Sequence, residues 1–126
     1  MGNDISQRIT IKIRAVDERL HNDRQLSKEV EQSITATKSN IHRLELQLIE
    51  QSTASDRSTH SSAVFIESMR TLGKQRASLK SLENQRIQLA QQMKHAAEDI
   101  EHYRYWLGYA ETDDVAKQLE AEKHVF

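Results

Sequence analysis

The sequence predicts an all-α protein, built as a long antiparallel two-helix coiled-coil hairpin with a short C-terminal helix. Apolar residues recur at steps of three and four along two long stretches, a Ser/Thr-rich segment separates these stretches, and the 126 residues include no Pro and only three Gly. Such steps place apolar side chains on one helix face, and the scarcity of Pro and Gly leaves long helices uninterrupted. Residues 1–126 are therefore expected to form a single helical hairpin domain.

The first helix is expected over residues 4–52. Two heptad rows form its apolar seam, with Asp23, Ser27 and Thr37 as polar exceptions within the rows. Because these rows are adjacent on a helix, their side chains can face one partner helix. The apolar members of the seam are Ile9, Ile13, Val16, Leu20, Val30, Ile34, Ile41, Leu44 and Leu48.

The connection is placed at residues 53–61, because seven of the eleven residues 52–62 are Ser or Thr. These residue types cap and turn better than they propagate a helix. The second helix is then expected over residues 62–110, with Arg86 as its polar seam exception. Its apolar stripe comprises Phe65, Met69, Leu72, Leu79, Leu82, Leu89, Met93, Ala96, Ile100, Tyr103, Leu107 and Ala110.

An antiparallel register brings the polar exceptions of the two seams together. Ser27 lies opposite Arg86 in this register, and Asp23 lies one turn away. Since polar seam residues commonly fix register at a cost in stability, we interpret Asp23, Ser27 and Arg86 as a register-setting polar layer. The same register pairs Ile13 with Ile100, Val16 with Ala96, Leu20 with Met93, Val30 with Leu82, Ile34 with Leu79, Ile41 with Leu72 and Leu48 with Phe65.

A short third helix is expected over residues 113–124. Thr112 can serve as its N-cap, and Asp113 and Asp114 would lie in the first turn, where their charge suits the helix dipole.

Four of the six aromatic residues lie within positions 103–109. Tyr105, Trp106 and Tyr109 cannot all face the first helix, so at least part of each is available to another surface. Tyr and Trp often anchor interfaces, which predicts a partner-binding site at these three residues. The alternative is that the third helix folds back and covers them with Val115, Leu119 and Phe126.

No catalytic, cofactor-binding or metal-binding residue is expected. The glycines, at positions 2, 73 and 108, are too far apart for a glycine-rich phosphate loop, and there is no Cys. His95, Asp99 and His102 share a helix face, but His95 and His102 fall on its solvated outer side and the first helix offers no matching ligands.

The charge and hydropathy of the chain exclude further classes of function. A formal net charge of -1 argues against a dedicated nucleic-acid binder. No segment approaches the roughly 20 apolar residues that span a bilayer, so we expect no stable membrane insertion and a cytoplasmic location. Gly2 and Ser6 fit the N-myristoylation pattern, but a single acyl chain anchors a protein only marginally.

A helical hairpin with a serine-rich tip and a late aromatic cluster resembles the FliJ/YscO/HrpO family of export-apparatus stalk proteins. The local matches are Phe65-Ile66 with Met69 one turn later, and Tyr105-Trp106-Leu107. The resemblance implies a non-enzymatic stalk or chaperone escort of a type III secretion or flagellar export apparatus. Its implied partners are the export ATPase, the export gate or secretion chaperones, at the periphery of a membrane-bound assembly.

Two other classes of function compete with this hypothesis. One is a coiled-coil adaptor or tether, with or without N-myristoylation, for which self-association, such as a homodimer, is expected. The other is a small helical enzyme or metalloprotein, which would require a bound metal.

Overall fold

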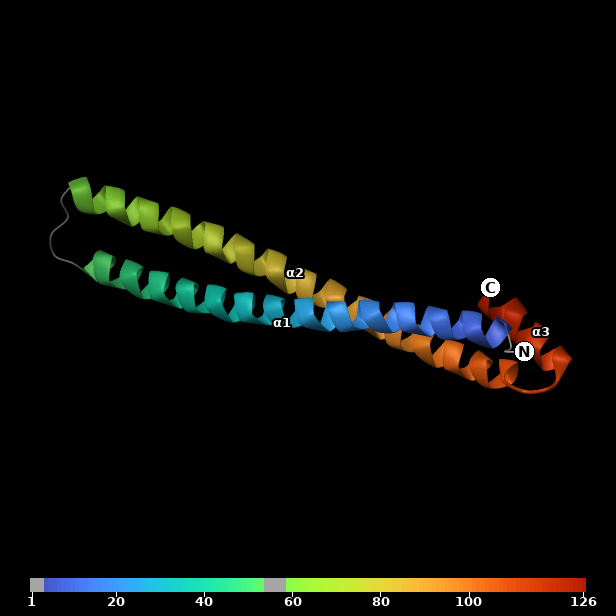
Figure 1. The fold of residues 1–126 in the computed structure, drawn as a ribbon. Coiled ribbons are helices and arrows are strands. Elements are labelled where there is room, and N and C mark those ends of the chain that lie inside the picture. The colour runs from blue at the N-terminus through green and yellow to red at the C-terminus, as the bar shows by residue number, and fades with distance from the viewer. Residues whose placement is uncertain (1–3, 54–58) are drawn as a thin grey trace. The chain divides into compact units, whose positions relative to one another are not determined.

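The computed structural model describes the backbone of residues 4–53 and 59–126, with side chains at 4–52 and 63–126. This part of the chain forms three helices and no strand: α1 (Asp4–Thr53), α2 (Thr59–Ala110) and α3 (Val115–Val125) (Figure 1). The two long helices pack against each other, and α3 is the short C-terminal helix. The predicted all-α fold class is thus confirmed.

The helix boundaries differ from the predicted ones at four places, of which the smallest are the ends of α1 and α3, each one residue later than expected. Helix α2 begins at Thr59 rather than at residue 62. A first helical turn accommodates Ser and Thr well, so this Ser/Thr-rich segment contributes to the start of α2. The rest of the predicted connection, residues 54–58, lies outside the described residues, as does the acylation candidate Gly2.

Helix α3 begins two residues later than predicted, and its N-cap is Asp114 rather than Thr112. The Asp114 backbone is extended, and its carboxylate accepts a hydrogen bond from the Ala116 N–H at 2.9 Å. The Thr112 hydroxyl instead donates to the Tyr109 carbonyl at 2.8 Å, at the end of α2. Thr112 therefore contributes to the end of α2, and Asp114 caps the start of α3.

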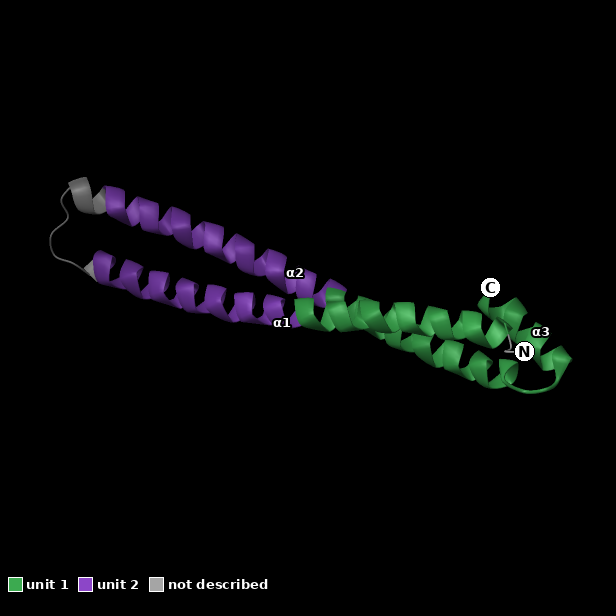
Figure 2. Cartoon of the chain, in the orientation of Figure 1, with its two compact units in different colours: residues 1–26, 89–126 green, residues 27–88 purple. Residues whose placement is uncertain are grey.

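The chain divides into two compact units. Each boundary falls inside a long helix, and the helix continues across it. Unit 1 comprises Met1–Leu26 and Leu89–Phe126, and unit 2 comprises Ser27–Gln88 (Figure 2). Each unit contains a stretch of α1 and the stretch of α2 that packs against it. Contacts in a helix pair are local along its length, so one uninterrupted pair of helices can form successive compact units.

Unit 1 holds two groups of packed apolar side chains. One group forms around Ile9, Ala110 and Ala121, all fully buried, and thus joins α1, the end of α2 and α3. The second forms around Leu20, Ala96 and Ile100, with Val16 and Met93 packed against it. The predicted partners Leu20 and Met93, and Val16 and Ala96, therefore belong to one cluster, which confirms the antiparallel pairing in this unit.

Unit 2 buries fewer side chains. Val30, Ile34 and Ile41 are buried on α1, and Leu72 is buried on α2. All four are members of the predicted seams. The specific contact expected between Ile34 and Leu79 stays a prediction.

Burial follows the predicted seam rows closely. Every seam position from Ile9 to Leu48 on α1, including the polar exceptions, is buried or partly buried. On α2 the one error is Met69, which is 53% exposed, whereas the neighbouring Ser68 is partly buried. Spacing, rather than hydrophobicity, determines which side chain faces the partner helix, and position 68 continues the heptad row that contains Leu82 and Leu89.

Candidate partner-binding site

The aromatic residues of α2 lie where α3 folds back onto unit 1. After α2 ends at Ala110, residues 111–114 reverse the chain without any residue of positive φ. The Gln118 side chain donates to the Thr112 carbonyl at 2.6 Å and ties α3 to this turn. Consequently α3 runs beside both the last turns of α2 and the first turns of α1 (Figure 1).

Tyr105, Trp106 and Tyr109 form one contiguous aromatic cluster. The Tyr105 and Trp106 rings meet edge to face at 5.1 Å between centroids, and the Tyr109 ring lies 5.4 Å from Tyr105 and 5.1 Å from Trp106. Tyr105 is 59% exposed, whereas Trp106 and Tyr109 are partly buried against the apolar group around Ile9. The structure therefore brings the three predicted residues together but exposes them unequally.

Helix α3 covers part of this cluster. The imidazole of His124 stacks on the Trp106 ring at 4.3 Å with an angle of 7° between the planes. Ala121 is fully buried, and Val125 packs against the same apolar group. The expected cover by Val115, Leu119 and Phe126 is wrong in its residues, because these side chains are 65%, 57% and 44% exposed.

The outward direction of Val115 and Leu119 follows from helical periodicity. Positions 115 and 119 lie on one side of α3, nearly opposite Ala121, whereas Phe126 follows the helix as its C-cap. Because α3 has apolar residues on both sides, its sequence alone does not show which side packs. The smaller inner side chains allow α3 to approach the bulky aromatic rings of α2 closely.

Two cations from α1 complete the contact with α3. Arg8 lies 3.4 Å from the Glu122 carboxylate, and Lys12 donates a hydrogen bond to the Val125 carbonyl at 3.2 Å. Both cations also lie over the Phe126 ring, at 4.1 Å for the Arg8 guanidinium and 4.6 Å for the Lys12 ammonium. Cation–π attraction thus adds to the ion pair at this point.

The pKa of one hydroxyl reports the packing of the cluster. The pKa of Tyr105 is raised above its ordinary value of 10.0, mainly by a hydrogen bond with Tyr109 and further by the unfavourable interaction between two tyrosinate charges. Both causes favour the neutral form of Tyr105.

The predicted polar layer falls where the two units meet in the sequence. Asp23 belongs to unit 1, and Ser27 and Arg86 belong to unit 2. All three side chains are partly buried. The ion pair shown for Arg86 is with Glu31, at 3.5 Å. The register also predicts an ion pair between Arg86 and Asp23, which stays a prediction.

The ion pairs between helices in unit 2 bear on the register. Glu31 lies one turn closer to the connection than Ser27, the predicted neighbour of Arg86. Side chains lean toward the N-terminus of their own helix. Arg86 on α2 therefore leans toward the connection, and Glu31 on α1 leans away from it, so the two side chains approach each other. Arg76 contacts Glu45 at 3.1 Å. Extending the register that pairs Ile34 with Leu79 would place position 37 opposite Arg76, so Glu45 lies two turns nearer the connection, more than this lean accounts for. This pair indicates that the pairing drifts toward the connection within unit 2.

No group of three or more His, Asp or Glu side chains suited to a metal ion occurs among the described residues. His95 instead lies 3.7 Å from Glu98, and both side chains are largely exposed. No helix within the described ranges is long and apolar enough to cross a membrane.

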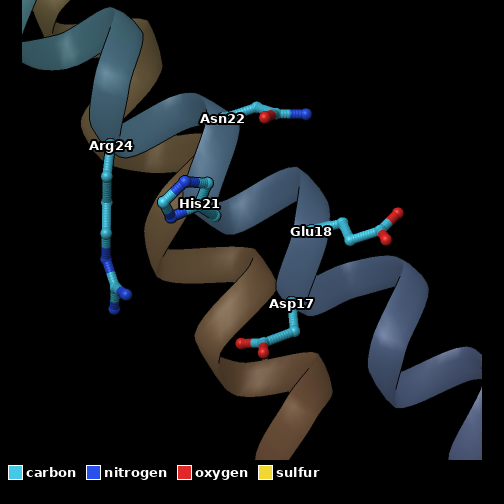
Figure 3. Close-up of a pocket in the computed structure, with 5 residues that line it drawn as sticks. All are labelled: Asp17, Glu18, His21, Asn22 and Arg24. Atoms are coloured by element: carbon cyan, nitrogen blue, oxygen red, sulfur yellow. The ribbon is translucent and has the colours of Figure 1, made fainter.

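The side chains that line a surface hollow on α1 do not form a catalytic or ligand-binding site. Asp17, Glu18, His21, Asn22 and Arg24 line it, all at exposed positions of one helix. Figure 3 shows that Glu18 and Asn22 point away from Asp17 and Arg24. These side chains do not converge as catalytic groups or ligands must.

The fold and the aromatic cluster define the class of this molecule as an all-α helical hairpin with a helix packed on its aromatic end. Comparison with known proteins adds no family to this description: no family model, curated protein or solved structure matches the chain.

The sequence analysis missed the contributions of Arg8, Lys12 and His124 to the site. Arg8 and Lys12 are one turn apart and lie on the same side of Ile9 on α1, which is a usable signal for a cationic edge beside a buried position. His124 carried no such signal, because its role depends on which side of α3 packs.

Proposed function

We propose that the chain is a non-enzymatic protein–protein interaction module whose partner surface includes Tyr105, Trp106 and Tyr109. The observation that carries this proposal is the aromatic cluster, in which Tyr105 is 59% exposed while its ring rests on Trp106 and Tyr109. A rigid aromatic side chain held by its neighbours buries a large area on binding and loses little rotamer entropy. It is therefore suited to anchor a partner.

The particular role we propose is that of a stalk or escort in a type III secretion or flagellar export apparatus. Its support is the resemblance of the hairpin, Phe65-Ile66 and Tyr105-Trp106-Leu107 to the FliJ/YscO/HrpO family. Charge gives a second reason: residues 65–97 carry six Lys or Arg against two Glu, and residues 98–126 carry eight acids against three bases. Such an uneven distribution can orient a partner. The partner in this proposal is an export ATPase or its associated gate, and the location is cytoplasmic.

The test is a binding titration of the purified chain against an export ATPase. Tyr105→Ala should weaken binding by about 2 kcal/mol if Tyr105 is an interface hot spot. Ile87→Ala is a matched control, because Ile87 is 54% exposed on the same helix outside the aromatic cluster. Equal affinities of the wild type and Tyr105→Ala, with a loss in Ile87→Ala, would place the surface on the shaft.

Trp106→Ala should also weaken binding by about 2 kcal/mol. Because Trp106 stacks on His124 and packs in the apolar group around Ile9, we expect this variant to lose thermal stability as well. Comparison with Tyr105→Ala separates the two effects, since Tyr105 contributes less to the packed interior.

An adaptor or tether that self-associates is the second candidate function. Its support is a group of apolar side chains that are exposed in unit 2 near the connection: Leu46, Ile49, Val64, Ile66 and Met69. Sedimentation equilibrium should then show a dimer that Ile66→Lys dissociates, whereas Ile87→Lys does not. A wild-type chain that is monomeric at all accessible concentrations would exclude this candidate.

A further inference from the structure

Helix α3 is part of unit 1 and packs on the rest of that unit much as a separate ligand would. It has 11 residues, and isolated helices shorter than about 12–15 residues are marginal in water. Its one fully buried side chain is Ala121, which provides little apolar area. The stability of α3 therefore depends on the surface beneath it.

That surface combines an aromatic part and a cationic part. Trp106 and Tyr109 of α2 provide the aromatic part, and Trp106 stacks on His124. Arg8 and Lys12 of α1 provide the cationic part, through contacts with Glu122, the Val125 carbonyl and the Phe126 ring. We call these four residues, Arg8, Lys12, Trp106 and Tyr109, the α3-binding surface.

One acid of α3 complements this surface. Helix α3 carries two Glu against two Lys, so its charge is balanced, and Glu122 is the acid that meets Arg8. The ion pair between Arg8 and Glu122 is 42% exposed on each side, so water screens it and its contribution is small. The two cations of the surface, Arg8 and Lys12, therefore suit a helix richer in acidic residues than α3, with an aromatic residue near its end.

We propose that the α3-binding surface is a docking site for an acidic amphipathic helix of a partner protein, and that this helix displaces α3. Displacement exposes Trp106 and Tyr109, which α3 partly covers, and so adds them to the exposed Tyr105. The inference deepens the proposed interaction function and rests on it for the existence of a partner. It adds the kind of helix that the partner presents.

The short tether of α3 favours a distinct partner over a second copy of this chain. Residues 111–114 connect α3 to α2, and a short linker gives an effective concentration on the order of 1 mM. A second copy would offer the same helix without this advantage. A partner helix with larger apolar side chains on its inner face can compete, because α3 places only Ala121 in the fully buried position.

The test uses the full chain and a fluorescein-labelled peptide of residues 112–126 as the probe. Ala121→Arg forces a large charged side chain into a fully buried position and should release α3. Ala116→Arg is the matched control, because Ala116 lies at an exposed position of the same helix. By fluorescence anisotropy, Ala121→Arg should bind the peptide at least tenfold more tightly than the wild type and Ala116→Arg.

A second variant that releases α3 and an internal fluorescence reporter distinguish release of α3 from a folding defect. Val125→Asp should also open the surface, because Val125 packs against the Ile9 group. Trp106 is the single tryptophan of the chain, so its emission should shift to the red on release of α3 and return toward the blue when the peptide binds. Circular dichroism should show that the long helices persist.

A charge exchange tests the cationic part. Arg8→Glu in the Ala121→Arg background should weaken peptide binding at least fivefold, and a peptide with Glu122→Arg should restore part of the loss. Equal peptide affinities of both release variants and the wild type would overturn the proposal. A wild-type dimer formed by exchange of α3 would reassign the surface to a second copy. None of these outcomes depends on the export ATPase. A failure of this proposal can therefore be distinguished from a failure of the Tyr105 binding test.

Discussion

Arg86 illustrates how the environment of one residue limits the energy of its ion pair. It occupies a seam row of α2, yet its side chain is 42% exposed and that of Glu31 is 52% exposed. Exposed pairs are screened by water and lose side-chain entropy on forming, so their net contribution is small. The position thus favours one register at little gain in stability.

Arg86→Leu should therefore leave the free energy of unfolding within about 1 kcal/mol of the wild type, or raise it. The physical reason is that leucine adds apolar area to the seam while only a screened ion pair is lost. Urea denaturation followed by circular dichroism measures the change, with Arg70→Leu at an exposed intrahelical pair as the control. A loss of several kcal/mol would show that Arg86 is held by stronger contacts, and sedimentation would reveal any new oligomer.

Tyr105 provides a residue-scale prediction about pH. Its pKa is raised in the folded protein, first by the hydrogen bond with Tyr109. The neutral form is thus favoured by folding, and the associated stability is present at neutral pH and lost as the pH rises through the folded-state pKa. In a spectrophotometric titration, Tyr109→Phe should lower the highest tyrosine pKa of the chain, whereas Tyr103→Phe should leave it unchanged.

At the scale of the elements, α3 depends on local capping more than the long helices do. Helices α1 and α2 have 50 and 52 residues, so their end effects are a small part of their stability. Helix α3 has 11 residues, and Asp114 satisfies one of its first backbone donors. Loss of this cap therefore removes a larger share of the stability of α3 than a comparable loss would remove from α1 or α2.

Asp114→Ala should destabilise α3 by about 1 kcal/mol, the usual cost of removing an N-cap side chain. Trp106 fluorescence follows the docking of α3 directly, since His124 stacks on Trp106. The thermal transition by fluorescence should therefore fall below that by circular dichroism, which reports mainly α1 and α2. Asp113→Ala removes the adjacent carboxylate but not the cap, and an equal effect of both variants would attribute the change to charge alone.

At the scale of the whole molecule, the absence of Cys from the sequence allows a direct test of the register. Ile34→Cys combined with Leu79→Cys should form a disulfide readily on mild oxidation, because both side chains lie in the seams of unit 2 and are paired in the predicted register. Ile34→Cys with Leu82→Cys is the matched control, one short turn away. Faster oxidation of the control pair would show that the drift indicated by Arg76 and Glu45 extends to Ile34.

The seams could be predicted because helical periodicity is a local property. Each seam position follows from its neighbours three and four residues away, and the burial of Ile34, Ile41 and Leu72 agrees with it. The assignment of Met69 to the seam was wrong because apolar character was given more weight than spacing. Tyr105, Trp106 and Tyr109 were correctly grouped for the same reason, since residues that lie within one turn on a helix must be neighbours.

The sequence by itself determined the two long helices, the seam on each of them and the aromatic cluster, because each rests on spacing within a single helix. The tertiary structure alone decided which side of α3 packs, which cations of α1 meet it, and that Arg86 contacts Glu31. These features depend on contacts between residues far apart in the chain. For a helix with apolar residues on both sides, only the shape and charge of the opposing surface make one side the more stable choice.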